Sequence, residues 1–161
     1  MVENRDNQME SSKIIQCFPS SKIAACEDIF NGSPESVYID MSKYERVTFT
    51  VMKNAGAVGT ATAQIKSSTV AAGTSPTARA HKYRKATDGE IYTSWAAAVA
   101  SGTTISAGAD EVWQFSIAAS DLSGDRYCGF KLTEVDSTAV DGMVFAEVFG
   151  PRYSDLYDDA V

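Results

Sequence analysis

The stretch from Glu111 to Tyr153 constrains the fold more than any other part of the chain, because it holds three apolar runs separated by two turn-rich spacers. In the first two runs, apolar and polar residues alternate. Successive side chains of a β-strand point to opposite faces, so a period of two predicts half-buried antiparallel strands. The predicted inward positions of these two runs are Trp113, Phe115, Ile117, Cys128, Phe130 and Leu132.

The third run, residues 143–149, is apolar on both faces. One face carries small aliphatic side chains, and the other carries Phe145 and Phe149 with Glu147 between them. A strand with two apolar faces is either central in a sandwich or covered by another chain. We therefore take Phe145, Glu147 and Phe149 as candidate subunit-interface residues.

Earlier segments repeat the strand pattern in short pieces. Residues 46–51 place three apolar side chains inward, with Thr48 and Thr50 outward, and residues 60–66 alternate in the same way. Residues 96–100 are expected to form one helical turn, but no long helical period occurs in the sequence. Short strands at regular spacing predict an all-β protein, an antiparallel β-sandwich or jelly-roll-like domain.

The composition divides the chain into three parts. Residues 1–27 are expected to form a flexible N-terminal arm or extension, which could order against a shell or a neighbouring subunit. Residues 28–153 hold the predicted β-sandwich domain, and residues 154–161 form an acidic C-terminal tail. With 161 residues in total, the chain is long enough for one domain with a substantial core.

Charge and cysteine content exclude several classes. The net charge of −7 argues against a nucleic-acid partner, because phosphate binding needs a positive surface. No apolar run approaches the roughly 20 residues of a membrane span, and the polar N-terminus does not resemble a secretory signal. Cys17, Cys26 and Cys128 are therefore expected to be reduced thiols of a protein made in a cytoplasm, although a Cys17–Cys26 disulfide remains an alternative.

The only basic cluster lies at residues 79–85. As a single strand it would place Arg79, His81, Tyr83 and Lys85 on one face. Three interpretations stay open: a solvated edge strand protected by lysines, contact with nucleic acid, and docking onto an acidic partner. We take these four residues as candidates for partner docking.

The sequence offers no recognisable catalytic chemistry. The single histidine, His81, has no nucleophile motif beside it, and the cysteines lack the spacing of a zinc site. We therefore expect no enzyme activity, no cofactor and no metal. The alternative is a calcium site, if the loop carboxylates gather at one end of the domain. Those carboxylates are Asp121, Asp125, Asp136 and Asp141.

Several runs of residues resemble a known group of proteins. They are Asp28–Gly32, Val37–Phe49, Gly59–Thr62 and the closing Gly150-Pro151-Arg152-Tyr153. In these runs the chain resembles small structural proteins of tailed bacteriophages and prophages. The resemblance implies a virion component on the capsid surface, a capsid decoration or cement protein. The resemblance further implies two partners, the major capsid protein and other copies of the chain in a homotrimer. It also implies synthesis in the host cytoplasm.

Two other functions remain open at this point. A tail, fibre or head–tail connecting component would have the same β-rich composition, although fibres usually show repeats and none occurs here. A carbohydrate-binding module is the second alternative, with Trp95, Trp113 or Tyr83 as the ring on which a sugar stacks.

Overall fold

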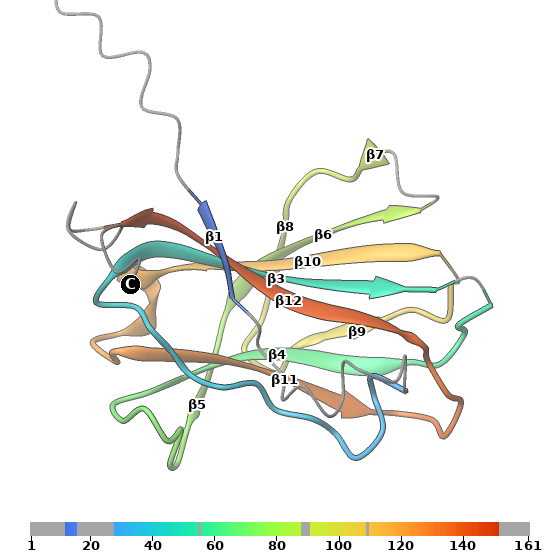
Figure 1. The fold of residues 1–161 in the computed structure, drawn as a ribbon, viewed down its shortest axis with the longest axis horizontal. Coiled ribbons are helices and arrows are strands. Elements are labelled where there is room, and N and C mark those ends of the chain that lie inside the picture. The colour runs from blue at the N-terminus through green and yellow to red at the C-terminus, as the bar shows by residue number, and fades with distance from the viewer. Residues whose placement is uncertain (1–11, 16–27, 55, 88–90, 109, 152–161) are drawn as a thin grey trace, which may run out of the picture.

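Two antiparallel β-sheets pack face to face in the computed structural model, which describes residues 12–15, 28–54, 56–87, 91–108 and 110–151 (Figure 1). Within these residues, the only helical element is the 3-10 turn η1 (Ala119–Leu122). The predicted all-β antiparallel sandwich is therefore confirmed.

The larger sheet, sheet A, has the strand order β1–β12–β3–β10–β6–β7, and β8 also pairs with β6. Its strands are β1 (Ser12–Ile15), β12 (Gly142–Pro151), β3 (Tyr44–Lys53), β10 (Glu111–Ala118), β6 (His81–Thr87), β7 (Ile91–Tyr92) and β8 (Ala96–Ala98). The helical turn predicted at residues 96–100 is wrong. Alanine is a strong helix former, but pairing of β8 with β6 overrides this local preference, with Ala96 opposite Tyr83 and Ala98 opposite His81.

The smaller sheet, sheet C, has the strand order β2–β11–β4–β5, and β9 also pairs with β4. Its strands are β2 (Ile39–Asp40), β11 (Tyr127–Glu134), β4 (Ala61–Ser68), β5 (Thr77–Arg79) and β9 (Thr103–Ile105). The 3-10 turn η1 carries the chain from β10 of sheet A to β11 of sheet C, and Leu122 anchors it in the core.

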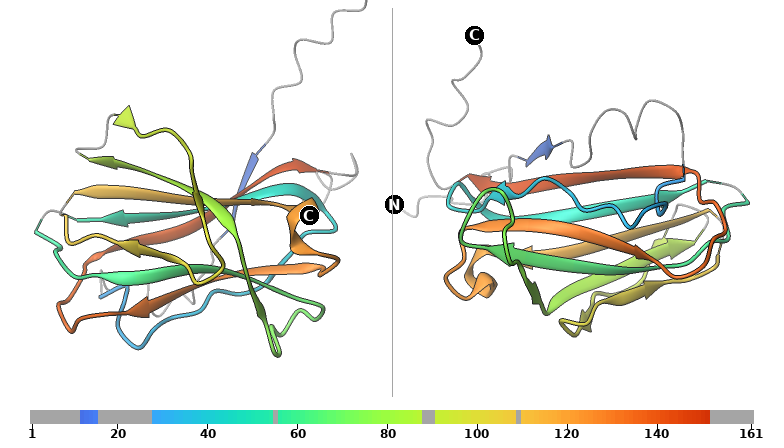
Figure 2. Two further views of the ribbon diagram at one scale, coloured as in Figure 1. Left: turned by 180° about the vertical axis from the view of Figure 1, so that it is seen from behind. Right: turned by 90° about the horizontal axis from the view of Figure 1, so that it is seen from below.

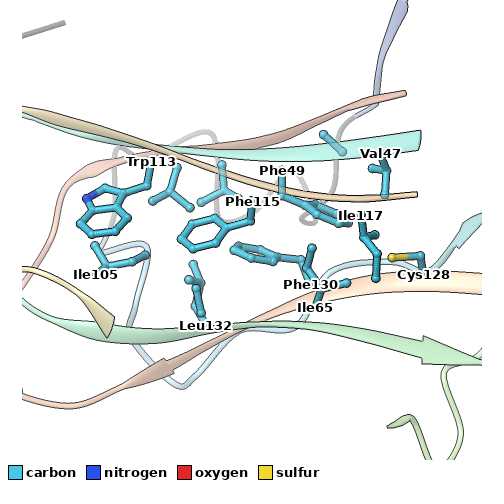
Figure 3. Packing of buried hydrophobic residues seen from close by; sticks show 14 of the residues in the cluster. Val47, Phe49, Ile65, Ile105, Trp113, Phe115, Ile117, Cys128, Phe130 and Leu132 are labelled. Atoms are coloured by element: carbon cyan, nitrogen blue, oxygen red, sulfur yellow. The ribbon is translucent and has the colours of Figure 1, made fainter. Parts of the chain in front are cut away.

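Aromatic rings fill the middle of the core between the sheets (Figure 3). Phe49 and Phe130 stack with ring centroids 4.9 Å apart, and Phe115 meets Phe130 at 5.3 Å. The inward positions predicted for β10 and β11 are confirmed, because the six side chains concerned are all buried. Because side chains alternate in direction along each strand, one face of each sheet contributes its apolar side chains to the shared core.

The basic cluster does not form one strand. β5 ends at Arg79 in sheet C, and β6 begins at His81 in sheet A, so the chain changes sheets at Ala80 (Figure 2). Local contacts fix the residues before and after Ala80 in different sheets. The Arg79 guanidinium pairs with Asp125 beside sheet C, whereas the His81 ring packs edge-on against Phe115 of sheet A.

Part of the predicted N-terminal arm belongs to sheet A. Ser12–Ile15 form β1, which pairs antiparallel with β12 and places Ile14 opposite Glu147. The rest of residues 1–27, including Cys17 and Cys26, and the predicted acidic tail at 154–161 lie outside the described residues.

Candidate binding surface

The outer face of sheet A, which points away from the core, carries an unusual mixture of side chains. The strand registers align its residues in rows that cross the strands. One row runs Phe145–Thr50–Gln114–Arg84, and the next runs Glu147–Thr48–Ser116–Lys82. Each row therefore crosses β12, β3, β10 and β6, so residues far apart in sequence share one surface.

An open groove of about 1150 Å³ follows the second row and the Gln114–Arg84 end of the first. Its floor is made by Thr48 and Ser116, whose small side chains lie below their larger neighbours and are buried. The Thr48 hydroxyl donates a hydrogen bond to Ser116 Oγ at 3.0 Å. The sequence correctly predicted that Thr48 faces outward, but the long side chains around it still shield it from solvent.

Arg84 forms one wall of the groove and is held in place on several sides. Its Nε donates to Gln114 Oε1 at 2.7 Å, and Gln114 Nε2 in turn lies 3.5 Å from Thr50 Oγ1. Its guanidinium stacks on the rings of Tyr92, 4.3 Å from the ring centroid, and Trp95, at 4.5 Å. Stacked and hydrogen-bonded arginine loses little conformational entropy on binding, so this wall is preorganised.

Exposed and half-buried apolar side chains gather on the β12 side of the same face. We call this set the apolar strip; its members are Ile14, Met52, Met143, Phe145 and Phe149. Ile14 is 68% exposed and Met143 is 51% exposed, while both phenylalanines are half-buried. Arg46 lies over the Phe149 ring, 4.7 Å from its centroid.

The structure brings the candidate interface residues together. Phe145, Glu147 and Phe149 all lie on the outer face of β12, with the apolar strip on either side of Glu147. The opposite face of β12, which includes Val144, enters the core. The two apolar faces of this strand thus have different surroundings. Contact of the outer one with another subunit stays a prediction.

The four residues predicted to dock a partner are engaged inside the molecule. His81 is buried, Tyr83 stacks on Trp113 with ring centroids 6.1 Å apart, and Lys85 Nζ lies 3.0 Å from Glu111 Oε1. Arg79 is paired with Asp125, 2.7 Å away. His81, Tyr83 and Lys85 face the inner side of sheet A, because side chains alternate along β6 and Lys82 and Arg84 point outward. Docking through the four stays a prediction, but the outward pair is better placed for it.

A buried polar cluster closes one end of the core. Lys53 Nζ donates to the carbonyl oxygens of Ser106 at 2.7 Å and Gly59 at 3.2 Å. The Glu111 carboxylate accepts bonds from Trp113 Nε1 at 2.9 Å and from the Ser106 hydroxyl. Burial raises the pKa of Glu111, but these bonds and the bond from Lys85 outweigh it and hold that pKa below its usual value. Burial lowers the pKa of Lys53.

Sequence reasoning missed this cluster. Lys53 and Glu111 continue the inward rows of β3 and β10, where the alternation called for apolar residues. A charged residue at an inward position of an otherwise regular strand was the signal that could have revealed them.

The loop carboxylates do not gather at one end, which corrects the prediction of a possible shared calcium site. The loops that contain them precede and follow β11, so they lie at opposite ends of that strand. Asp125 pairs with Arg79, and Asp136 accepts hydrogen bonds from Thr60. Among the described residues, no group of three or more histidines, cysteines or acidic residues is arranged to hold a metal ion.

Comparisons with family models, with curated proteins and with solved structures gave no match to this chain. No helix in the described residues is long and apolar enough to cross a membrane.

Proposed function

We propose that the chain is a structural protein of a tailed-phage virion, a capsid decoration or cement protein that staples neighbouring shell subunits without covalent bonds. The observation that carries the proposal is the apolar strip on the outer face of sheet A. The solvent face of an antiparallel sheet is normally polar, and contiguous exposed apolar side chains mark protein contacts.

The strip has the make-up of a protein interface. Phenylalanine and methionine are enriched at interface cores, and charged residues form the rim. Here Arg46 and Glu147 lie among the apolar side chains and would supply polar contacts. A protein that binds only the assembled shell lowers the free energy of that state relative to loose subunits. The same strip would also join copies of the chain into a trimer.

Co-sedimentation tests this proposal. The chain would be produced together with the major capsid protein encoded by the same genome, and assembled shells would be separated on a sucrose gradient. We expect the chain to travel with the shells. Light scattering on the purified chain is expected to give about three times 17.2 kDa.

Matched variants identify the surface. Phe145→Ser together with Phe149→Ser should remove the chain from the shell fraction and leave a folded monomer. Val135→Ser changes an exposed apolar residue that lies outside the strip, so its occupancy should match the wild type. Wild-type chain that never sediments with shells would refute the decoration role, and sedimentation with tails instead would assign it to a tail, fibre or connector.

A further inference from the structure

Two partly exposed aromatic rings line the groove on sheet A, and one of them, Phe149, already belongs to the apolar strip. Three rings were candidates for stacking a sugar, and two of them are engaged internally: Trp113 is 4% exposed, and Tyr83 stacks on it. Trp95, just before β8, is 40% exposed and lines the groove. Arg84 packs on this indole, 4.5 Å from its centroid, and so fixes the orientation of the ring.

The groove also presents hydroxyl and amide groups at fixed positions. The groove is lined by Gln114, Thr48 and Ser116. Thr48 of β3 donates a hydrogen bond to Ser116 of β10, and Gln114 of β10 lies within bonding distance of Thr50 of β3. An aromatic platform beside a few convergent polar groups is the typical composition of a small-ligand site. A pyranose ring matches both parts, because one of its faces carries C–H groups and its rim carries hydroxyls.

The charge of the groove selects an anionic ligand. Arg46, Lys82 and Arg84 line it, and neither Lys82 nor Arg84 forms an ion pair within the described part of the chain. A fourth basic residue of the lining, Arg79, is already paired with Asp125, which lies outside the groove. The lining acids are Asp121 and Glu147, so the surface is locally basic on a chain whose net charge is −7.

The direction of the groove favours an oligosaccharide over an acidic peptide. One common way for an extended peptide to bind is to add a strand to an exposed sheet edge, where main-chain hydrogen bonds supply the affinity. This groove instead crosses four strands that are paired with one another. Side chains alone are therefore available for recognition. The crossing spans about 14 Å, since neighbouring strands lie about 4.8 Å apart, which is room for about three sugar rings.

We propose that the outer groove of sheet A binds an acidic oligosaccharide. One sugar ring stacks on Trp95, a carboxylate of the ligand is held by Arg84 and Lys82, and ring hydroxyls bond to Gln114 and Ser116. Charge-assisted bonds from an arginine fork give the carboxylate both affinity and orientation. The Trp95 end of the groove lies on the β8 side of the face, away from most of the apolar strip, while Phe149 and Glu147 line the opposite end.

Tryptophan emission of the full chain provides the test, because only Trp95 is accessible to a ligand. Trigalacturonate is the first probe, followed by sialyllactose and a sulfated trisaccharide, with maltotriose as the neutral comparison. We expect saturable quenching by an acidic sugar and binding of maltotriose at least about tenfold weaker, as loss of a charge-assisted contact implies.

Variants separate the two parts of the site. Trp95→Phe should abolish the quenching signal, while calorimetry still detects binding. Trp95→Ala should weaken binding by about tenfold, and Lys82→Ala should weaken it for acidic sugars alone. Lys43→Ala, an exposed lysine in the turn between β2 and β3, is the matched charge control and should bind normally.

Three results would overturn the proposal. They are the absence of saturable binding by all three acidic sugars, unchanged affinity in Trp95→Ala, and tighter binding of hexa-aspartate than of any sugar. The last result would assign the groove to an acidic peptide.

Discussion

The two faces of sheet A follow different rules, although adjacent residues of the same strands build both. In β10 the inner face carries Trp113, Phe115 and Ile117, all buried between the sheets, whereas the outer face carries Gln114 and Ser116. The inner face is set by stacked rings that the fold requires. The outer face combines exposed apolar side chains with a basic, polar groove, which the fold does not require. Side chains that are costly to expose and are not needed for packing therefore mark the surface on which function is expected, and in this chain they lie on the outer face of sheet A.

The largest expected difference in stability between the two faces comes from truncating neighbouring residues of β10 that point to opposite sides. Phe115→Ala removes a ring that packs on Phe130 and leaves a cavity, so we expect a loss of about 3–5 kcal/mol of unfolding free energy. Gln114→Ala should cost less than about 1 kcal/mol. Urea unfolding followed by circular dichroism measures both. Equal losses would show that the outer face is also part of the core.

The polar end of the inner face provides an intermediate effect. Glu111→Gln removes the carboxylate that accepts bonds from Trp113 and Lys85, and it leaves the buried Lys53 without this nearby negative charge. We expect a loss of about 2–3 kcal/mol in urea unfolding. Glu35→Gln is the control, because its pairs with Lys66 at 3.6 Å and Lys131 at 3.9 Å are partly exposed and should be worth less than about 1 kcal/mol. A larger loss in the control would contradict this ranking.

The smallest expected effect is a pH dependence from the inner face of β6. Nδ1 of His81 donates to the Arg79 carbonyl oxygen at 3.0 Å, and its Nε2 is buried with no partner among the described residues. Burial lowers the pKa of His81 below its ordinary 6.5. The unfolded chain therefore binds the proton first, so stability is complete above pH 6.5 and falls as the pH drops below it.

The slope from this one group is at most about 1.4 kcal/mol per pH unit. His81→Phe should remove the loss between pH 6.5 and 5 and keep the ring contact with Phe115. Carboxylates such as Asp40, whose pKa is lowered chiefly by the hydrogen bond from Arg126, add their own loss only at more acidic pH. Thermal melts over pH 4–8 measure both phases. A wild-type profile that is flat between pH 5 and 6.5 would rule out this role for His81.

The sequence predicted the inner faces well, because strand alternation is a local property. The positions of Phe49, Phe115 and Phe130 follow from a period of two. What failed depended on distant partners. The change of sheets at Ala80 arises from contacts that Arg79 and His81 make with other strands.

The candidate site was predictable only in part. Phe145, Glu147 and Phe149 were identified from one strand because an apolar outer row is visible in its sequence. The groove was not, since it exists only once β12, β3, β10 and β6 lie side by side in register. Alternation predicted Trp113 to face inward and left Trp95 as a candidate ring, but the contact of Trp95 with Arg84 could not be predicted from one strand.

The position of β12 in sheet A bears on how the protein is made. This strand lies between β1 and β3. Until residues 142–151 have left the ribosome, β3 has no neighbour on that side, and its open edge can pair with other nascent chains. The β1–β12–β3 part of sheet A can therefore form only after those residues have emerged. Products of premature termination before Gly142 would lack the strand that joins β1 to β3.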